Sequence, residues 1–214
     1  QRGKNTYVRY QEETYQAFVK RMDIQERLRR SVEENYKGFE LYYQPIVNTR
    51  KKKILGAEAL LRWQDDVVGR LSPAEFVPLL EESGLIIPVE RWVIRTALEQ
   101  CLCWQKKDKN FRMNINLSSI QLKKSDVIMD IETIMQELGI GNHNVLFEVT
   151  ESGELESDSI TQKILFSFRK RNLNLGIDDF GTGYSNFRYV KEMMFDLVKI
   201  DKAFIRHNPC QGDR

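Results

Sequence analysis

The sequence predicts an α/β fold built around a mostly parallel sheet. From Phe39 onward, short apolar segments with the two-residue alternation of strands take turns with helix-like segments of roughly ten to twenty residues. Strands separated by helices are joined by crossover connections, which place them parallel in one sheet. Each candidate strand also ends in polar or acidic residues, and the active sites of α/β folds gather at those ends. Both a doubly wound sheet and a barrel fit this pattern, and periodicity does not choose between them.

The residues before Phe39 have a different character. We expect a short strand at residues 6–10 and a charged helical linker over residues 11–38. Within this linker, Asp23 and Glu26 form a capping-box-like pair that predicts a second helical start. Apolar residues at helical spacing leave open a coiled-coil contact, whereas the low apolar content favours a solvated connector.

Turn and cap signals divide the remaining chain into elements. Ser72-Pro73-Ala74-Glu75 supplies an N-cap, a proline at the first helical position and a glutamate three residues after the cap. This helix should end near Gly84, and Gly139 should end a later one. The expected strands are 41–47, 54–63, 113–117, 145–149, 173–179 and 197–200; the further expected helices follow Pro88, span 126–138 and 159–171, and run from the turn at 181–185 to about 193.

Composition excludes several classes of protein. Lys and Arg number 33 and Asp and Glu 31, so the net charge of +2 offers no basic field, and we expect no binding of duplex nucleic acid. The three cysteines, Cys101, Cys103 and Cys210, are too few for a disulfide framework or a four-thiolate zinc site. No segment approaches eighteen consecutive apolar residues, as a membrane-spanning helix requires. We therefore expect a cytoplasmic location.

Acidic and amide residues lie in apolar surroundings near the ends of four expected strands. They are Glu58, Asn116, Glu148 and the adjacent pair Asp178 and Asp179. Several oxygen ligands at one edge of a sheet suit a hard divalent cation such as magnesium or manganese. Two such ions about 4 Å apart clamp the attacking and leaving oxygens in phosphate-ester cleavage. The alternative is that loop amides or basic side chains satisfy these groups without any metal.

Two basic residues could likewise have either a functional or a structural role. Lys199 lies inside an apolar strand, where an ammonium needs a carboxylate or phosphate partner. It would either orient an attacking water or form a structural salt bridge in the sheet, and composition alone favours the salt bridge. Arg62 could bind a phosphate oxygen or pair with a neighbouring aspartate. Gly181-Thr182-Gly183 permits a tight loop beside the aspartate pair.

Six motifs in chain order carry a resemblance to a known family. Residues 39–206 resemble the EAL-domain family of cyclic-di-GMP phosphodiesterases. The resemblance implies a TIM-like (β/α) barrel with one antiparallel strand, and hydrolysis of cyclic di-GMP to linear pGpG with Mg²⁺ or Mn²⁺ at a two-metal site. The motifs are Tyr43-Gln44-Pro45-Ile46-Val47, Ala57-Glu58-Ala59-Leu60-Leu61-Arg62-Trp63, Asn116-Leu117-Ser118, Glu148-Val149-Thr150-Glu151, Asp178-Asp179-Phe180-Gly181-Thr182-Gly183-Tyr184-Ser185 and Lys199-Ile200-Asp201.

The resemblance also assigns roles to individual residues. It implies that Lys199 lies beside the catalytic water and that Glu151 braces the loop after Asp179, so that these three join Glu58 as the catalytic set. The implied metal ligands are Glu58, Asn116, Glu148, Asp178 and Asp179, and the implied contacts to the dinucleotide are Gln44, Leu61 and Arg62.

Family organisation leads to further expectations. Residues 1–10 resemble the end of a GGDEF domain, which implies an upstream GGDEF or sensor domain, residues 11–38 a linker, and residues 39–214 the EAL domain. The family pattern continues through two more strands after the Lys199 strand, with a further metal-binding glutamate and a glutamine. We therefore expect an incomplete barrel that lacks its last two strands. Family relatives often dimerise, so a homodimer is expected as well.

Three functional hypotheses follow. The first is a metal-dependent phosphodiesterase, which the joint presence of the acidic residues and Lys199 favours. The second is a non-catalytic cyclic-di-GMP receptor or an inactive fragment, which the expected loss of two strands favours. The third is a protein-interaction module that binds neither metal nor nucleotide. Metal-dependent nucleotide binding separates the third hypothesis from the other two.

Overall fold

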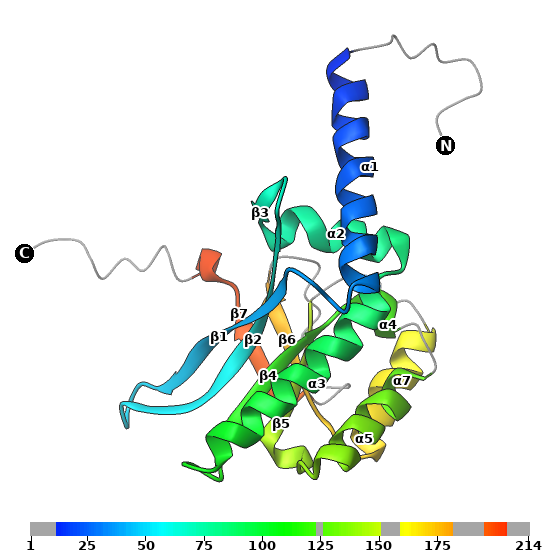
Figure 1. The fold of residues 1–214 in the computed structure, drawn as a ribbon. Helices are drawn as coiled ribbons and strands as arrows, with labels where there is room; N and C mark the ends of the chain where they lie inside the picture. The colour runs from blue at the N-terminus through cyan, green and yellow to red at the C-terminus, as the bar shows by residue number, and fades with distance from the viewer. Residues whose placement is uncertain (1–11, 123–125, 151–158, 182–194, 205–214) are drawn as a thin grey trace, which may run out of the picture. The chain divides into compact units, whose positions relative to one another are not determined.

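A computed structural model describes residues 12–122, 126–150, 159–181 and 195–204 of the chain (Figure 1). The strand expected at 6–10, the GGDEF-like remnant at 1–10, Glu151, the helix expected up to about 193 and Cys210 lie outside these residues. Within the described part, none of the helices combines the length and the apolar character that a membrane span requires.

The chain divides into two compact units. The first unit comprises residues 1–39 and 62–85, and the second comprises residues 40–61 and 86–214. The first contains the helices α1 (Glu12–Glu33) and α2 (Pro73–Ser83), the short strand β3 (Gly69–Leu71) and the end of β2 (Lys53–Asp65). The second contains the remaining strands and helices.

An aromatic cluster forms the core of the first unit. Trp63 and Phe76 are fully buried, and the centroids of their rings are 6.1 Å apart. Leu28 of α1 is also fully buried, and the indole Nε1 of Trp63 donates a hydrogen bond of 3.0 Å to Ser31 Oγ. The second half of α1 therefore packs into this core. α1 is one continuous helix, so the second helical start predicted at Asp23 is wrong; a capping-box spacing inside a helix supplies surface side chains instead of a cap.

The α2 helix begins as its sequence predicts. Its N-cap is Ser72, Pro73 is the first helical residue, and Glu75 Oε2 accepts hydrogen bonds from the backbone N–H (3.0 Å) and the hydroxyl (2.8 Å) of Ser72. Gly84 ends the helix with a φ of 72°, a left-handed conformation that glycine adopts at little cost.

The sheet runs in the order of the chain. Neighbouring strands are β1, β2, β4, β5, β6 and β7, and β3 pairs with β2. The pairs from β2–β4 to β6–β7 are parallel. β1 and β2 are joined by the turn at residues 49–52, and so short a connection joins only antiparallel neighbours. The strands with bounds not yet given are β1 (Phe39–Asn48), β4 (Arg112–Leu117), β5 (Val145–Thr150), β6 (Asn174–Phe180) and β7 (Leu197–Ile200).

The main helices of the second unit lie along one face of this sheet (Figure 1). They are α3 (Ile86–Gln105), α5 (Val127–Leu138) and α7 (Ser159–Lys170). Three short helices lie in the connections: α4 (Ser119–Leu122) after β4, η1 (Asn142–Asn144) before β5 and η2 (Lys202–Phe204) after β7. A doubly wound sheet reverses its strand order and carries helices on both faces. Chain-ordered strands with helices on a single face are instead the winding of a TIM-like barrel. The α/β prediction is confirmed, and this winding settles the choice that periodicity left open.

Candidate active site

Parallel pairing brings the polar residues of the predicted strands onto one face of the sheet. Glu58 of β2 is in register with Asn114 of β4, and Asn116 of β4 with Glu148 of β5. Asp178 of β6 is in register with Thr150, the last residue of β5. Side chains alternate between the faces of a strand. The intervening residues Ala57, Ala59, Met113, Ile115, Phe147, Val149 and Ile177 are buried.

The ammonium of Lys199 binds three of these carboxylates at once. Its Nζ lies 2.9 Å from Glu58 Oε2, 2.8 Å from Glu148 Oε2 and 2.9 Å from Asp178 Oδ2. Three N–H groups thus meet three carboxylate oxygens delivered by three different strands. The structural salt bridge that composition favoured is present, and it joins the residues that the sequence singled out for metal binding.

Two asparagine amides hold the other oxygens of the glutamates. Asn116 Nδ2 donates a hydrogen bond of 2.9 Å to Glu58 Oε1, and Asn114 Nδ2 donates one of 2.7 Å to Glu148 Oε1. Each glutamate is therefore held by an amide at one oxygen and by Lys199 at the other. Because both oxygens are engaged, the plane of each carboxylate is fixed.

Burial and charge act against each other at the centre of the cluster. Glu148 is fully buried, and burial raises the pKa of its carboxyl group, although Lys199 and Asn114 work in the opposite direction. For Lys199, burial alone would lower the pKa, but the hydrogen bonds to Glu148, Glu58 and Asp178 raise it above the usual value for lysine. Lys199 is therefore a permanent cation in this site.

The cluster fits a hard divalent cation. Glu58, Glu148 and Asp178 each offer an oxygen, and these oxygens all lie within 4.8 Å of one another. Carboxylate and amide oxygens are the donors that magnesium and manganese prefer. With Lys199 as the one ammonium, the three carboxylates leave a net charge of two negative units, which one divalent cation would balance.

A break in the strand pairing separates Asp178 from Asp179. The β6–β7 register shifts between Ile177 and Phe180, and Asp179 has a φ of 53°. Such irregularities re-aim side chains near active sites. Asp178 joins the cluster, whereas Asp179 is exposed and lies outside the group of three carboxylates. Although Asp179 is exposed, neighbouring atoms keep part of the solvent away from its carboxyl group, and this loss of solvation together with the charges of Asp178 and Asp201 raises its pKa.

The remaining predicted residues have varied positions. Gln44 is exposed on β1, and Leu61 is half-buried in the part of β2 that belongs to the second unit. Arg62 is half-buried and belongs to the first unit. Glu151, Thr182 and Gly183, and with them most of the predicted tight loop, lie outside the described residues. Gly181 has a φ of 102°, a backbone conformation that glycine adopts at little cost.

Sequence reasoning missed two polar residues near the cluster. Asn114 supports Glu148, and its position two residues before Asn116, on the same face of β4, was the available signal. Glu90 of α3 is buried, and its Oε1 accepts a hydrogen bond of 2.7 Å from the backbone N–H of Ser118. Because Ser118 follows β4 directly, Glu90 fixes the chain just beyond Asn116. A glutamate at one position of a helix gives no hint of this contact.

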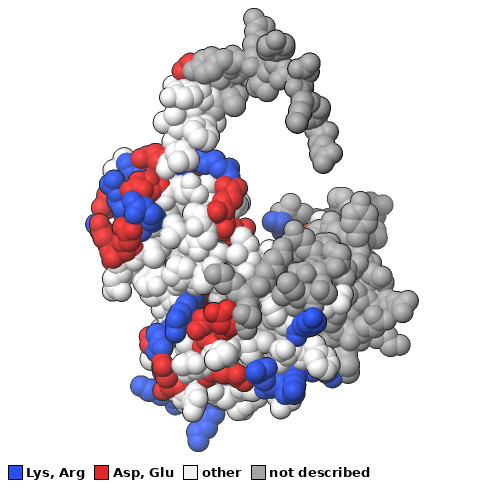
Figure 2. Space-filling view, turned by 90° about the vertical axis from the view of Figure 1, so that its right-hand side faces the viewer, with Lys and Arg blue, Asp and Glu red and all other residues white. Residues whose placement is uncertain are grey.

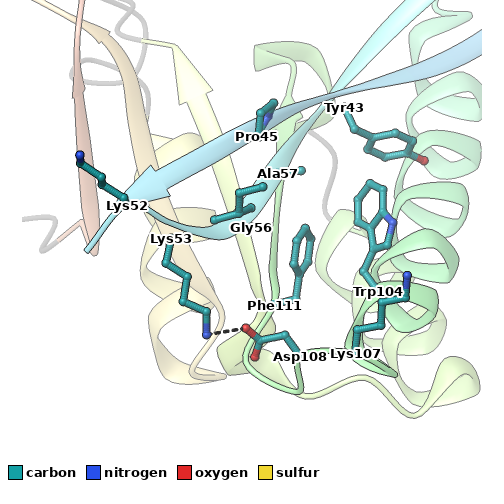
Figure 3. Close-up of a pocket in the computed structure, with 11 residues that line it drawn as sticks. Tyr43, Pro45, Lys52, Lys53, Gly56, Ala57, Trp104, Lys107, Asp108 and Phe111 are labelled. Carbon is teal, nitrogen blue, oxygen red and sulfur yellow. Dashed lines mark ion pairs between the residues drawn. The ribbon is translucent and has the colours of Figure 1, made fainter. Parts of the chain in front are cut away.

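The structure also contains a pocket that is not lined by the three carboxylates of the cluster. Its volume is about 650 Å³, and Tyr43 of β1, Trp104 of α3 and Phe111 line it (Figure 3). Its charged groups are surface residues, and Lys53 is already paired with Asp108 at 2.9 Å. Burial raises the pKa of Tyr43 to about 12. The described residues that line this pocket do not include the convergent buried polar groups that mark a catalytic site.

The charged surface agrees with the nearly balanced composition. On the face that Figure 2 presents, basic and acidic side chains lie interspersed over the coloured residues.

Comparison with known proteins gives relatives with similar sequences. An uncharacterised protein of Synechocystis is 36% identical over 97% of this chain, which spans 30% of that protein. The cyclic di-GMP phosphodiesterase PA2567 of Pseudomonas aeruginosa is 34% identical over 79% of this chain, which spans 29% of that protein. The chain thus spans less than a third of the length of these relatives.

A solved structure and a family model agree with these relatives. The structure of the EAL enzyme Bd1971 with cAMP and cyclic di-GMP bound superposes with a TM-score of 0.79 at 32% identity, covering 91% of this chain and 54% of that one. The model of the EAL domain matches residues 25–214. With the winding of the sheet, the carboxylate cluster and this match all in agreement, the chain belongs to the EAL-domain family.

Proposed function

We propose that this domain hydrolyses cyclic di-GMP to linear pGpG in a metal-dependent reaction. The observation that carries the proposal is the group of three carboxylates from Glu58, Glu148 and Asp178, gathered around Lys199 at one face of the sheet. Family membership supports it, since the relative PA2567 is named a cyclic di-GMP phosphodiesterase. In the reaction, the oxygen of water bonds to one of the two phosphorus atoms and the bond to a ribose 3′-oxygen breaks, with a proton passing to that oxygen.

The residues of the cluster have two proposed roles: some bind the metal ions, and others hold the metal ligands or the substrate in position. Glu58, Glu148, Asp178 and the carbonyl oxygen of Asn116 would bind Mg²⁺ or Mn²⁺, and Asp179 would contribute to a second ion. Ions of this kind polarise phosphoryl oxygens and lower the pKa of water toward neutrality. Lys199 keeps the three carboxylates together and, as a permanent cation, provides positive charge beside the attacking water. Gln44, Leu61 and Arg62 are the proposed contacts to the dinucleotide, and Glu151 the proposed support for the loop after Asp179.

The direct test is chromatography of cyclic di-GMP after incubation with the chain and MnCl₂. We expect linear pGpG from the parent chain and none from Glu58→Gln, which keeps the size of the side chain but removes its charge. Chelation with EDTA should stop the parent reaction, and excess MnCl₂ should restore it. Equal product from the parent and Glu58→Gln would show that the carboxylate cluster is not the site of hydrolysis.

The same samples separate the two other hypotheses. Binding of cyclic di-GMP without product, measured by calorimetry, would identify a receptor. Neither binding nor product is the outcome that an inactive fragment or a protein-interaction module predicts. We also propose that the natural protein carries an upstream GGDEF or sensor domain, and that the domain forms a homodimer in the cytoplasm. Light scattering of the purified chain measures its molar mass in solution, and a homodimer should have twice the mass of one chain.

A further inference from the structure

We infer that Asn114 is a positioning residue that holds the carboxylate of Glu148 in place for cation binding. Its Nδ2 lies 2.7 Å from Glu148 Oε1, and both residues are buried, with exposed fractions of 5% and 0%. The inference rests on the proposed function, because it assigns Asn114 a role at the same metal site.

The sheet register explains how Asn114 reaches its partner. Asn116 is directly opposite Glu148 on the neighbouring strand, and Asn114 is opposite Leu146, two residues earlier on β5. Asn114 therefore contacts Glu148 along the diagonal of the strand pair, a separation that long side chains bridge. This leaves Asn116 available to bind Glu58 Oε1 instead. One strand thus supplies a separate amide to each glutamate.

An amide has an advantage over a basic side chain at this position. Lys199 already neutralises one of the three carboxylate charges, so the cluster retains two negative charges for a divalent cation. A second lysine or an arginine in place of Asn114 would remove one of them. The amide of Asn114 directs the orientation of Glu148 and leaves the charge of the cluster unchanged.

Groups that orient metal ligands have a measurable effect on metal affinity. Their loss weakens metal binding by about 10- to 100-fold, because the ligand then samples orientations that do not bind. Without Asn114, Oε1 of Glu148 would lose this hydrogen bond, and the contact of Oε2 with Lys199 alone would leave the carboxylate plane free to rotate. We therefore expect Asn114→Leu to lower the affinity for Mn²⁺ by about that factor.

The chain contains a matched control. Asn144 is also buried, with an exposed fraction of 4%, and its Nδ2 donates hydrogen bonds to the backbone oxygens of Lys109 (3.2 Å) and Phe111 (3.1 Å). Asn144→Leu removes a buried amide of the same kind without touching a carboxylate. Both variants should unfold at lower temperature than the parent, and only Asn114→Leu should bind Mn²⁺ more weakly.

The experiment is calorimetric titration of MnCl₂ into the parent, Asn114→Leu and Asn144→Leu without nucleotide. A loss of Mn²⁺ affinity in Asn114→Leu, with Asn144→Leu within about twofold of the parent, supports the inference. Equal Mn²⁺ affinity in all three, or an equal loss in both variants, overturns it. If Asn114→Leu does not fold, Asn114→Ser, which is smaller and polar, replaces it with the same expected direction.

Turnover of cyclic di-GMP separates this inference from the proposed function. If the parent binds no Mn²⁺ and yields no product, the proposed function itself fails. If the parent is active, Asn114→Leu should be impaired at low MnCl₂ and recover as MnCl₂ is raised, because excess metal compensates for weaker binding. An active parent with an Asn114→Leu variant of unchanged metal dependence contradicts the positioning role alone.

Discussion

Lys199 Nζ lies 2.8 Å from Oε2 of Glu148, a carboxylate that is completely buried. A buried carboxylate without a partner is costly, so this contact is what allows Glu148 to remain inside the sheet. The same ammonium also binds Glu58 and Asp178, so a single positive charge reduces the repulsion among three negative ones. Because one ammonium does not balance three carboxylates, the cluster stays negative and can attract a further cation.

Replacement of this lysine should therefore destabilise the metal-free domain. In Lys199→Met the hydrophobic stem is retained, and the three carboxylates lose their shared cation. We expect the free energy of unfolding to fall by about 1–3 kcal/mol without metal. The loss should shrink when MnCl₂ is present, because the divalent ion supplies the missing charge. Urea unfolding with and without MnCl₂ measures both values.

An exposed lysine provides the control for this variant. Lys163 lies on the surface of α7, and Lys163→Met should leave the urea midpoint nearly unchanged in either buffer. Identical midpoints for the parent and Lys199→Met without metal would mean that the ammonium does not support the cluster.

Close packing of β2 against β4 should make Gly56 intolerant of any side chain. A Cβ atom at Gly56 would lie 2.3 Å from the backbone oxygen of Arg112, with which Gly56 is in register. Gly56→Ala should force the strands apart at a cost of about 1–3 kcal/mol. Since Glu58 is two residues further along β2, the same shift should weaken Mn²⁺ binding. Thermal unfolding and calorimetry measure the two effects.

Gly139→Ala is the control that separates the loss of stability in Gly56→Ala from its loss of Mn²⁺ affinity. Gly139 follows α5 with a φ of 68°, and a Cβ atom there would meet open space among the described residues. The variant should lose about 1 kcal/mol of stability through backbone strain alone. Its Mn²⁺ affinity should equal that of the parent; a similar loss of affinity in both variants would show that general destabilisation, and not strand displacement, weakens the site.

The hydrogen bond between Trp63 and Ser31 should couple α1 to the aromatic core of the first unit. Ser31→Ala leaves the indole N–H of Trp63 without its partner, and we expect a loss of about 1 kcal/mol in the free energy of unfolding. Trp63→Phe removes the same bond from the other side. A double-mutant cycle measured by circular dichroism should give a coupling energy near 1 kcal/mol. Additive losses would mean that the bond contributes nothing.

The two described cysteines should differ in reactivity. Cys101 is fully buried, and burial raises the pKa of its thiol to about 11, so only about 0.1% would be thiolate at pH 8. Cys103 is exposed. In a Cys210→Ser background, iodoacetamide at pH 8 should modify Cys103 and spare Cys101 until urea unfolds the chain. Mass spectrometry of the peptides identifies the modified residue. Equal labelling of both thiols in the folded chain would contradict this burial.

The elements with strong local signals were predictable from sequence. The start of α2 at Ser72 and the end of α5 at Gly139 follow from side-chain and glycine preferences that act within a few residues. The α3 helix begins at Ile86, before the start expected after Pro88, because proline is tolerated in a first helical turn. β3 escaped prediction because three residues carry no measurable periodicity.

The sequence indicated the three carboxylates that the structure brings together, and it indicated their geometry less well. Alternation placed Glu58, Asn116 and Glu148 on one face, and register then brought them together. The choice of Asn114 as the partner of Glu148 depends on a diagonal contact that spacing along one strand does not reveal. Asp178 and Asp179 differ in position because the strand pairing is irregular between Ile177 and Phe180. Two identical residues side by side in the sequence give no sign of such an irregularity.

The chain order of the sheet has a consequence for how the protein matures. Lys199 and Glu58 are 141 positions apart, yet their side chains are 2.9 Å apart. A contact at this sequence separation forms slowly, because a long loop must close first. During synthesis, the carboxylates of β2, β5 and β6 emerge from the ribosome before the lysine that unites them. Until β7 is made, a nascent chain therefore lacks the ammonium that its three carboxylates share, and the cluster can form only after β7 has been synthesised.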